Sequence, residues 1–355
     1  MAYISVVKKL LAFVLIAALG RSAAAQSPGT IIGDVVTRET GAPLDHSMIS
    51  LISAGRQTFS NDVGRFAFSQ LAPGNYRIRV AHLGFTPVDT SFVIPESGPA
   101  PRLKILLTRL SVRLVAVQVL AKPSCTTPGR PDPVLQADFS AVVQQLRMNA
   151  EQYQLLSDSF PFAYSLQKAR RQIRADEHLG VASYDTVHSR SDYRGWEYKV
   201  GEVVERERDG SYFMHLPTLR DFASIEFLNN HCFRYAGTET NADGTFLRID
   251  FRVDDQIRTP DVNGSIFLDA KSYQIRLADL ELSRMDPRVP NVTAVRVKTY
   301  FEEVAPSIVI FGRVVGTNSL KHGWGGWSIA AEMEEQRMIK FDWLGADPRH
   351  STIIP

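Results

Sequence analysis

The sequence has little cysteine and no dominant charge. Only two of its 355 residues are cysteines, Cys125 and Cys232, and neither lies near the N-terminus, where a bacterial lipid anchor would be attached. Three basic residues, Lys8, Lys9 and Arg21, lie in the first 25 positions, and without them the 40 basic residues fall to 37, against 38 acidic ones. Composition therefore gives no electrostatic reason to expect nucleic acid or an anionic membrane as a partner.

Recognised catalytic and metal-binding motifs are also absent. A His-x-x-Glu zinc site needs Glu three residues after His, and none of the eight histidines has one. These are His46, His82, His178, His188, His215, His231, His322 and His350. No His-Glu-x-x-His, Gly-x-Ser-x-Gly or Gly-x-x-x-x-Gly-Lys motif occurs. We predict a protein without catalytic residues, cofactor or metal, although a triad assembled in space leaves no such motif.

Two short patterns have a chemical interpretation that competes with a structural one. His231 precedes Cys232, which would place an imidazole beside a thiolate, but one half of a disulfide is the favoured interpretation. Residues 240–245, TNADGT, resemble a calcium loop but lack its spaced oxygen ligands and terminal Glu. We expect a hairpin turn there.

The first 25 residues have the three parts of a secretory signal peptide. Lys8 and Lys9 precede the apolar stretch Leu10 to Leu19, and Ala23 to Ala25 supply small residues for cleavage. The apolar stretch is short for a membrane span, so we predict cleavage, with an uncleaved N-terminal anchor as the alternative. The protein is then expected in the periplasm or at the cell exterior, without a transmembrane segment.

An oxidising compartment changes what is expected of the two cysteines. Exported proteins usually keep cysteine pairs oxidised, so we predict a disulfide between Cys125 and Cys232. Two separately buried thiols are the alternative, because sequence does not show whether the two residues meet.

Residues 29–110 contain short strands separated by turn residues. Tyr76, Ile78 and Val80 alternate with Arg77 and Arg79, the period-two pattern of a half-buried strand. Strand-length runs about 8–12 residues apart, without a helical pattern, predict a small β-sandwich.

The turns of this region follow a recognisable order. The motifs are Gly33-x-Val35, Gly41-x-Pro43-Leu44, Asp62-Val63-Gly64-Arg65-Phe66 and Leu71-x-Pro73-Gly74-x-Tyr76-x-Ile78. In this order they resemble the carboxypeptidase regulatory-like domain, a transthyretin-like sandwich, over residues 29–110. The resemblance implies a fold and no reaction. Because the fold is classed with carbohydrate-binding sandwiches, a glycan-binding or adhesion module is an alternative, although Phe66, Phe68 and Tyr76 alternate as core residues do.

A connecting region and a helix follow the sandwich. Residues 111–133 are predicted to form a strand, Leu114 to Leu120, and then a proline-rich linker. In the next segment apolar residues recur with helical spacing, at Phe139, Val142, Val143 and Leu146, and Pro161 ends the pattern. We expect this helix to dock on a sheet; a partner helix or a membrane surface is the less favoured use.

The remaining sequence, from about residue 195, has long alternating runs that predict an antiparallel meander. A hairpin turn is expected at Asp269 to Ser272. The layout resembles the lipoprotein-carrier fold, an open curved sheet with a helical cover and an apolar concave face. Residues 134–355 would then form a second domain, with one helix and a larger antiparallel sheet.

Three tryptophans next to glycines are candidate ligand contacts. Trp196, Trp324 and Trp327 could line an apolar cleft or stack on a sugar, with burial in strands as the competing interpretation. The sequence thus predicts a mainly β, exported, non-catalytic binding or interaction protein of the bacterial cell envelope. An apolar-ligand or lipid carrier built on the C-terminal domain is the alternative, so the partner is an unidentified protein, glycan or apolar ligand.

Overall fold

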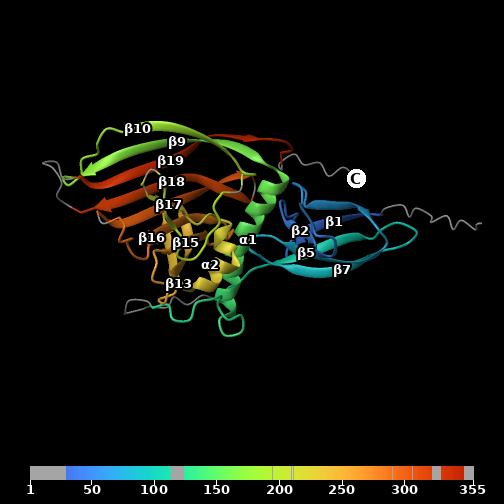
Figure 1. Ribbon diagram of the computed structural model, residues 1–355. Coiled ribbons are helices and arrows are strands. Elements are labelled where there is room, and N and C mark those ends of the chain that lie inside the picture. Colours follow the sequence, from blue (N-terminus) through green and yellow to red (C-terminus); the bar gives the residue numbers. More distant parts are fainter. Residues whose placement is uncertain are drawn as a thin grey trace, which may run out of the picture.

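The computed structural model describes residues 29–112, 124–193, 195–208, 210, 212–289, 291–305, 307–321 and 329–347. The predicted signal peptide, the predicted strand Leu114 to Leu120, and the candidates Trp324 and Trp327 lie outside the described residues. The fold is mainly β, as predicted. Figure 1 shows a small β-unit beside a large curved sheet, with helix α1 between them.

The small unit is a sandwich of two four-stranded sheets. One has the order β4-β1-β8-β6, with β1 (Gly29–Thr37), β4 (Arg65–Leu71), β6 (Phe85–Thr86) and β8 (Arg102–Arg109). The other has the order β3-β2-β5-β7, with β2 (Met48–Leu51), β3 (Arg56–Phe59), β5 (Gly74–Ala81) and β7 (Val88–Ile94). A short 3-10 helix, η1 (Ile52–Ala54), follows β2.

The aromatic residues of the sandwich fill its core. Phe66 and Phe68 are 0% and 2% exposed. The ring of Tyr76 stacks on Phe92 with centroids 5.6 Å apart, and its hydroxyl donates to the Ala72 carbonyl at 2.9 Å. The period-two alternation therefore reflects packing, and these three rings form no exposed platform for a sugar.

Gly64 explains the hairpin motif that marks this sandwich. Its φ is +74°, and a Cβ there would lie 2.5 Å from the Val35 carbonyl oxygen, so both backbone conformation and space favour glycine. The Asn61 side chain accepts hydrogen bonds from the backbone N–H groups of Val63 and Arg65 and closes the turn.

Helix α1 (Ala137–Ser159) forms where the apolar spacing predicts it. It is buried on two sides. Val142 and Leu146 pack into the core of the large sheet, whereas Met148 and Leu156 pack in a second core with Phe59 and other residues of the sandwich. No helix in the described part of the chain is long and apolar enough to cross a membrane.

The large sheet has nine antiparallel strands in the order β10-β9-β19-β18-β17-β16-β15-β14-β13. The strands are β9 (Phe162–Arg174), β10 (Ser183–Arg190), β13 (His231–Asn241), β14 (Gly244–Val253), β15 (Val262–Asp269), β16 (Ile275–Leu282), β17 (Val292–Ala305), β18 (Ile308–Leu320) and β19 (Ile329–Trp343). The predicted meander did not include two strands of this sheet, β9 and β10. Of these, β9 pairs with β19, the last strand of the described residues.

Both predicted hairpin turns are present. The turn between β13 and β14 is closed by the Asn241 side chain, which accepts from the N–H of Asp243. The turn between β15 and β16 is closed by the Asp269 carboxylate, which accepts from the N–H groups of Lys271 and Ser272. Residues 240–245 are a hairpin turn and not a calcium loop.

The segment before β13 differs from the prediction. Residues 195–210 were expected to form a long strand, but of those the structure describes, only β11 (Val204–Arg206) is a strand, paired with β12 (Tyr212–Met214). A 3-10 helix η2 (Asp221–Ala223) and a short helix α2 (Ile225–Asn230), neither of them predicted, follow. The residues between these elements cover the inner face of the sheet.

The two faces of the sheet differ in chemistry. One row of paired residues on the inner face runs through Tyr235, Ile249, Ile266, Ala278, Thr299, Val314 and Gln336. The adjacent row on the outer face runs through Arg234, Asp250, Ser265, Asp279, Lys298, Val315 and Glu335. The inner row is apolar and buried from β13 to β16, and becomes more polar from β17 onward.

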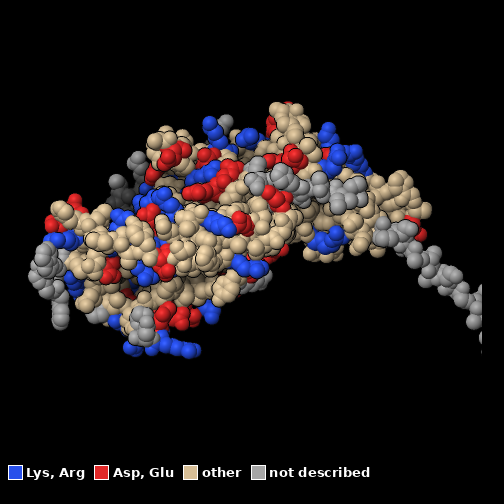
Figure 2. All heavy atoms as spheres, turned by 90° about the horizontal axis from the view of Figure 1, so that it is seen from above, with Lys and Arg blue, Asp and Glu red and all other residues tan. Residues whose placement is uncertain are grey.

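Charged residues on the outer face pair across strands. Lys298 lies 3.4 Å from Asp279, and Arg313 lies 2.7 Å from Glu335. Figure 2 shows acidic and basic side chains mixed on the side of the molecule nearest β10 and β9. Neither charge dominates there, in agreement with the balanced composition.

Candidate functional site

A cavity of about 880 Å³ lies between α1, the inner face of strands β9, β17, β18 and β19, and residues 189–226. Its volume is in the range of small-molecule sites, about 300–1,000 Å³. Aromatic side chains form much of its wall, among them Tyr153, Tyr164, Trp196, Phe213, Phe301 and Phe311. It lies over the part of the inner row formed by Thr299, Val314 and Gln336.

Two buried carboxylates fix the irregular wall of the cavity. Asp221 accepts from the N–H groups of Tyr198 and Thr218 and from the Thr218 hydroxyl. Asp261, which is 0% exposed, accepts from the Tyr198 hydroxyl and the Gly201 N–H. These bonds replace the strand pairing that this segment lacks. Burial raises the pKa of Tyr198, and the nearby Asp261 carboxylate raises it further.

Trp196, one of the three candidate ligand contacts, lines the cavity. Its ring stacks on His215 with centroids 4.7 Å apart and an interplanar angle of 8°. His215 also has a polar partner, because its Nε2 lies 2.7 Å from a Glu205 carboxylate oxygen. Phe213, on the neighbouring strand β12, lines the cavity and is 51% exposed. The wall therefore combines apolar rings with the imidazole of His215, whose carboxylate partner Glu205 is not among the lining residues.

Three arginines line the cavity, and their partners differ. Arg147 pairs with Glu151 at 2.7 Å. Arg190 makes two hydrogen bonds to Asp192, at 2.9 and 2.6 Å. Arg220 donates to the Ser157 hydroxyl at 2.5 Å, and its nearest carboxylate within the described residues, Asp158, lies 4.0 Å away.

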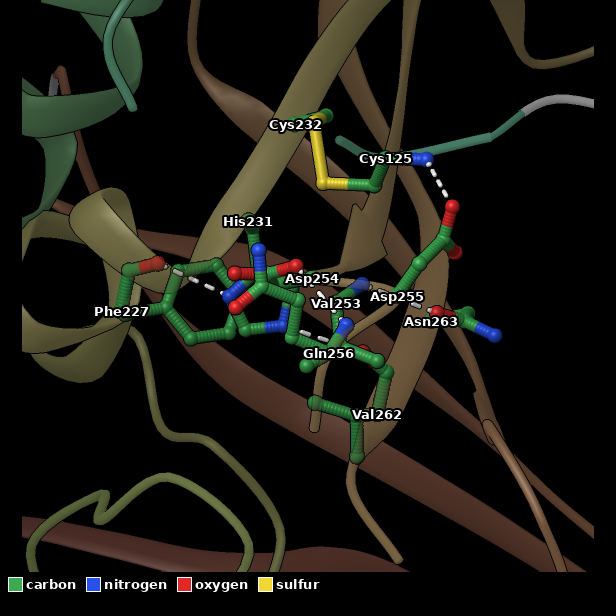
Figure 3. The surroundings of a disulfide bond; sticks show 10 residues. All are labelled: Cys125, Phe227, His231, Cys232, Val253, Asp254, Asp255, Gln256, Val262 and Asn263. Atoms are coloured by element: carbon green, nitrogen blue, oxygen red, sulfur yellow. Dashed lines mark hydrogen bonds between the residues drawn. A yellow bond between two sulfur atoms is a disulfide. The ribbon is translucent and has the colours of Figure 1, made fainter. Parts of the chain in front are cut away.

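The predicted disulfide between Cys125 and Cys232 is confirmed, with a Cα–Cα distance of 5.5 Å. Figure 3 shows the bond at the start of β13, with the Cys125 N–H donating to Asp255. Because Cys232 is oxidised, it offers no thiolate to the neighbouring His231. The alternative of two separately buried thiols is wrong.

His231 is a buried structural residue. Its Nδ1 lies 2.8 Å from the Phe227 carbonyl and its Nε2 lies 3.0 Å from the Val262 carbonyl. Burial lowers the pKa of this imidazole, while the Phe227 carbonyl and the Asp261 carboxylate oppose that shift. Neither His231 nor the disulfide lines the aromatic cavity.

A second groove, of about 750 Å³, crosses the outer face near the disulfide. It is lined by charged residues that largely pair with each other, such as Arg234 with Asp250 and Arg296 with Glu281. Among the residues that the structure describes, no group of three or more His, Cys, Asp or Glu side chains could hold a metal ion. The aromatic cavity is therefore the stronger candidate site.

Comparison with known protein families shows which domain the sandwich matches. Residues 30–108 match the carboxypeptidase regulatory-like domain. The match confirms the resemblance drawn from the turn motifs, and it covers less than a quarter of the chain. No curated protein matches the sequence.

Several solved structures are similar at low TM-scores. A domain from Vibrio parahaemolyticus named for outer membrane lipoprotein sorting is 11% identical, with 58% of this chain and 93% of that chain covered and a TM-score of 0.32. A LolA superfamily protein from Nitrosomonas europaea is 11% identical, with 59% and 97% covered and a TM-score of 0.29. A DUF1329 family protein from Desulfovibrio piger is 8% identical, with 58% and 95% covered and a TM-score of 0.32.

These neighbours include the lipoprotein-carrier class with which the strand pattern of the C-terminal region was compared. With TM-scores of 0.32 and below, this likeness says nothing about the function of the chain.

Proposed function

We propose that the protein is a non-catalytic binding protein that holds an amphiphilic ligand in the aromatic cavity. The observation that carries this proposal is a cavity of about 880 Å³ between α1 and the sheet, with several aromatic side chains in its wall. Apolar walls with a few placed polar groups are the usual composition of small-molecule sites. This favours the apolar-ligand alternative over a partner bound only through an outer surface.

The polar groups of the wall argue for a ligand that is not purely apolar. Arg220, His215 and Gln336 line the same cavity as Trp196 and Phe311. A hydrocarbon would leave such groups without water or a hydrogen-bond partner, which costs free energy. A ligand with an apolar body and a polar end satisfies both parts of the wall.

The sandwich supports the site and does not bind the ligand in this proposal. Phe66 and Phe68 lie in its own core, and Tyr76 is partly buried and packs against that core. The sandwich contacts α1, where the Gln145 side chain accepts from the Gly84 N–H at 2.8 Å. The same helix contributes Ala150 and Tyr153 to the cavity wall. The glycan-binding alternative rests on the fold class of the sandwich and predicts exposed aromatic residues there, which Phe66, Phe68 and Tyr76 do not provide.

We also propose that the protein has no catalytic activity. His215 and Glu205 are arranged as a general base and its orienting carboxylate often are. However, no serine, threonine or cysteine side chain of the described residues bonds to His215 as a nucleophile would. Panels of ester, peptide and glycoside substrates should give no turnover above that of a His215→Ala variant. Steady turnover that this substitution abolishes would make the protein an enzyme.

Export to the cell envelope is supported by the N-terminal sequence pattern and by the disulfide, which is typical of oxidising compartments. The mature protein should begin at Gln26 when it is recovered from an extracytoplasmic fraction and sequenced from its N-terminus. Recovery of the full-length chain from the cytosol, with both cysteines reduced, would contradict export.

The binding proposal is tested by filling the cavity. Val314 lines the cavity, whereas the next residue, Val315, lies on the opposite face of β18. A Val314→Trp variant should bind a fluorescent long-chain amphiphile at least about tenfold more weakly, while Val315→Trp should bind as the wild type does. Thermal melting of both variants controls for folding. Equal binding by the two variants would place the ligand elsewhere.

A further inference from the structure

Arg220 differs from the other two arginines of the cavity because its charge is poorly compensated. Arg147 and Arg190 each have a carboxylate oxygen within 2.7 Å. For Arg220 the only carboxylate partner among the described residues is Asp158, at 4.0 Å, and that side chain is 48% exposed. A separation of this size at a solvated carboxylate gives weak compensation.

The hydrogen bonds of the Arg220 guanidinium are also incomplete. Its Nε is buried and has no hydrogen-bond partner in the described part of the chain. Its Nη2 donates to an uncharged hydroxyl, that of Ser157, and the guanidinium lies over the Tyr153 ring at 5.7 Å. A guanidinium has five N–H donors in a fixed plane, and a charged group with an unfilled donor away from water costs free energy.

Neighbouring elements hold this side chain in place. Arg220 comes directly before η2, between Thr218 and Asp221, which are tied to each other by hydrogen bonds. Its head rests against the last turns of α1, whose carbonyl ends partly favour a cation. That helix end compensates some charge but gives Nε no partner. The arginine is thus fixed on the cavity wall with donor capacity that the protein does not use.

We propose that Arg220 binds the acidic head group of the ligand, so that the cavity selects an anionic amphiphile: an apolar chain ending in a carboxylate or a phosphate. This inference rests on the proposed function and specifies its ligand class. Carboxylate and phosphate oxygens accept hydrogen bonds from a guanidinium in pairs, in the plane of that group. The aromatic wall then takes the chain.

The test compares two probes of equal chain length, hexadecanoic acid and its methyl ester, in the full-length mature protein at neutral pH. The wild type should bind the acid at least about tenfold more tightly than the ester. Arg220→Gln should lose this preference while it still binds the ester. Arg190→Gln, the matched control in the same cavity, should keep the preference, because that arginine is already paired with Asp192. The affinity for hexadecyl phosphate, compared with that for the acid, shows whether the cavity prefers a phosphate or a carboxylate head group.

A second variant covers the case in which Arg220→Gln does not fold. Ser157→Ala removes the competing acceptor of Nη2 and retains the charge of Arg220, so it should increase the preference for the acid. Equal binding of acid and ester by the wild type would overturn the inference, as would an unchanged preference in Arg220→Gln or in Ser157→Ala. Binding of neither probe by the wild type would instead show that the proposed function itself is wrong.

Discussion

His82 shows how a single buried residue couples this fold to pH. It is 8% exposed, its ring meets Phe85 edge-on at 5.3 Å, and its Nδ1 lies 3.2 Å from the Ser47 hydroxyl. Burial lowers the pKa of His82 to about 4. The Asp45 carboxylate opposes this shift, and the nearby His46 and Arg109 add to it. The folded chain therefore favours the neutral imidazole over the protonated one.

The direction of the pH effect follows from this lowered pKa. Above the ordinary histidine pKa of about 6.5, neither the folded nor the unfolded chain binds a proton at His82, and its contribution to stability is complete. As the pH falls from about 6.5 toward 4, the unfolded chain binds the proton first. The free energy of unfolding should then fall by up to about 3 kcal/mol.

Urea unfolding at pH 7 and pH 4.5 measures this effect in the wild type and in His82→Asn. The variant should lose less stability between the two pH values than the wild type does. His178→Asn is the control, because that side chain is 78% exposed, and it should behave as the wild type. Identical pH dependence in His82→Asn and the wild type would show that His82 is not the responsible group.

At the scale of elements, α1 is the part on which both halves of the molecule depend. Gln145, 1% exposed, accepts from the Gly84 N–H and donates to the Phe85 carbonyl at 3.4 Å, which joins the helix to the sandwich. One turn later, Asn149 donates to the Tyr273 carbonyl and accepts from the Ile275 N–H, which joins the helix to the large sheet. These two amides bridge the two units.

Removing one bridge should lower stability measurably. Gln145→Ala leaves the Gly84 N–H buried without an acceptor, which costs about 1–3 kcal/mol. Gln144→Ala, on the same turn of the helix but half-buried, should change the free energy of unfolding by less than about 0.5 kcal/mol. Denaturant unfolding compares the two variants. A loss of similar size in both would mean that the bridge is unimportant.

The elements also show where sequence reasoning succeeds. Val142 and Leu146 of α1 and the hairpin at Asp269 could be predicted because the spacing of apolar residues and the turn residues act locally. Residues 195–210 alternate as a strand does, yet most of them are irregular. The N–H groups of Tyr198 and Gly201 bond to carboxylates more than 20 residues away in sequence, and no local pattern contains that information.

The same reasoning applies to the candidate site. Trp196 was singled out from its glycine neighbour and does line the cavity. Arg220 carries no local signal, because its role depends on Ser157 and Tyr153, which meet it only in the folded chain. The disulfide was predicted from compartment and count, since two cysteines in an exported chain have one intramolecular pairing.

At the scale of the whole molecule, the pairing of β9 with β19 decides where the cavity lies. In the sequence, β9 follows α1 directly, and β19 is the last strand of the described residues. Their pairing brings Tyr164 and Gln336 to the cavity opposite α1. The sandwich then supports the helix from outside (Figure 1). The cavity thus lies between α1 and the nine-stranded sheet.

Native mass spectrometry of the mature protein tests that hollow most directly. After incubation with a bacterial lipid extract and removal of excess lipid, the wild type and Val315→Trp should carry an added mass that organic extraction removes. Val314→Trp should remain at the mass of the polypeptide. The account is wrong if the wild type gains no mass, or if Val314→Trp carries as much ligand as the wild type.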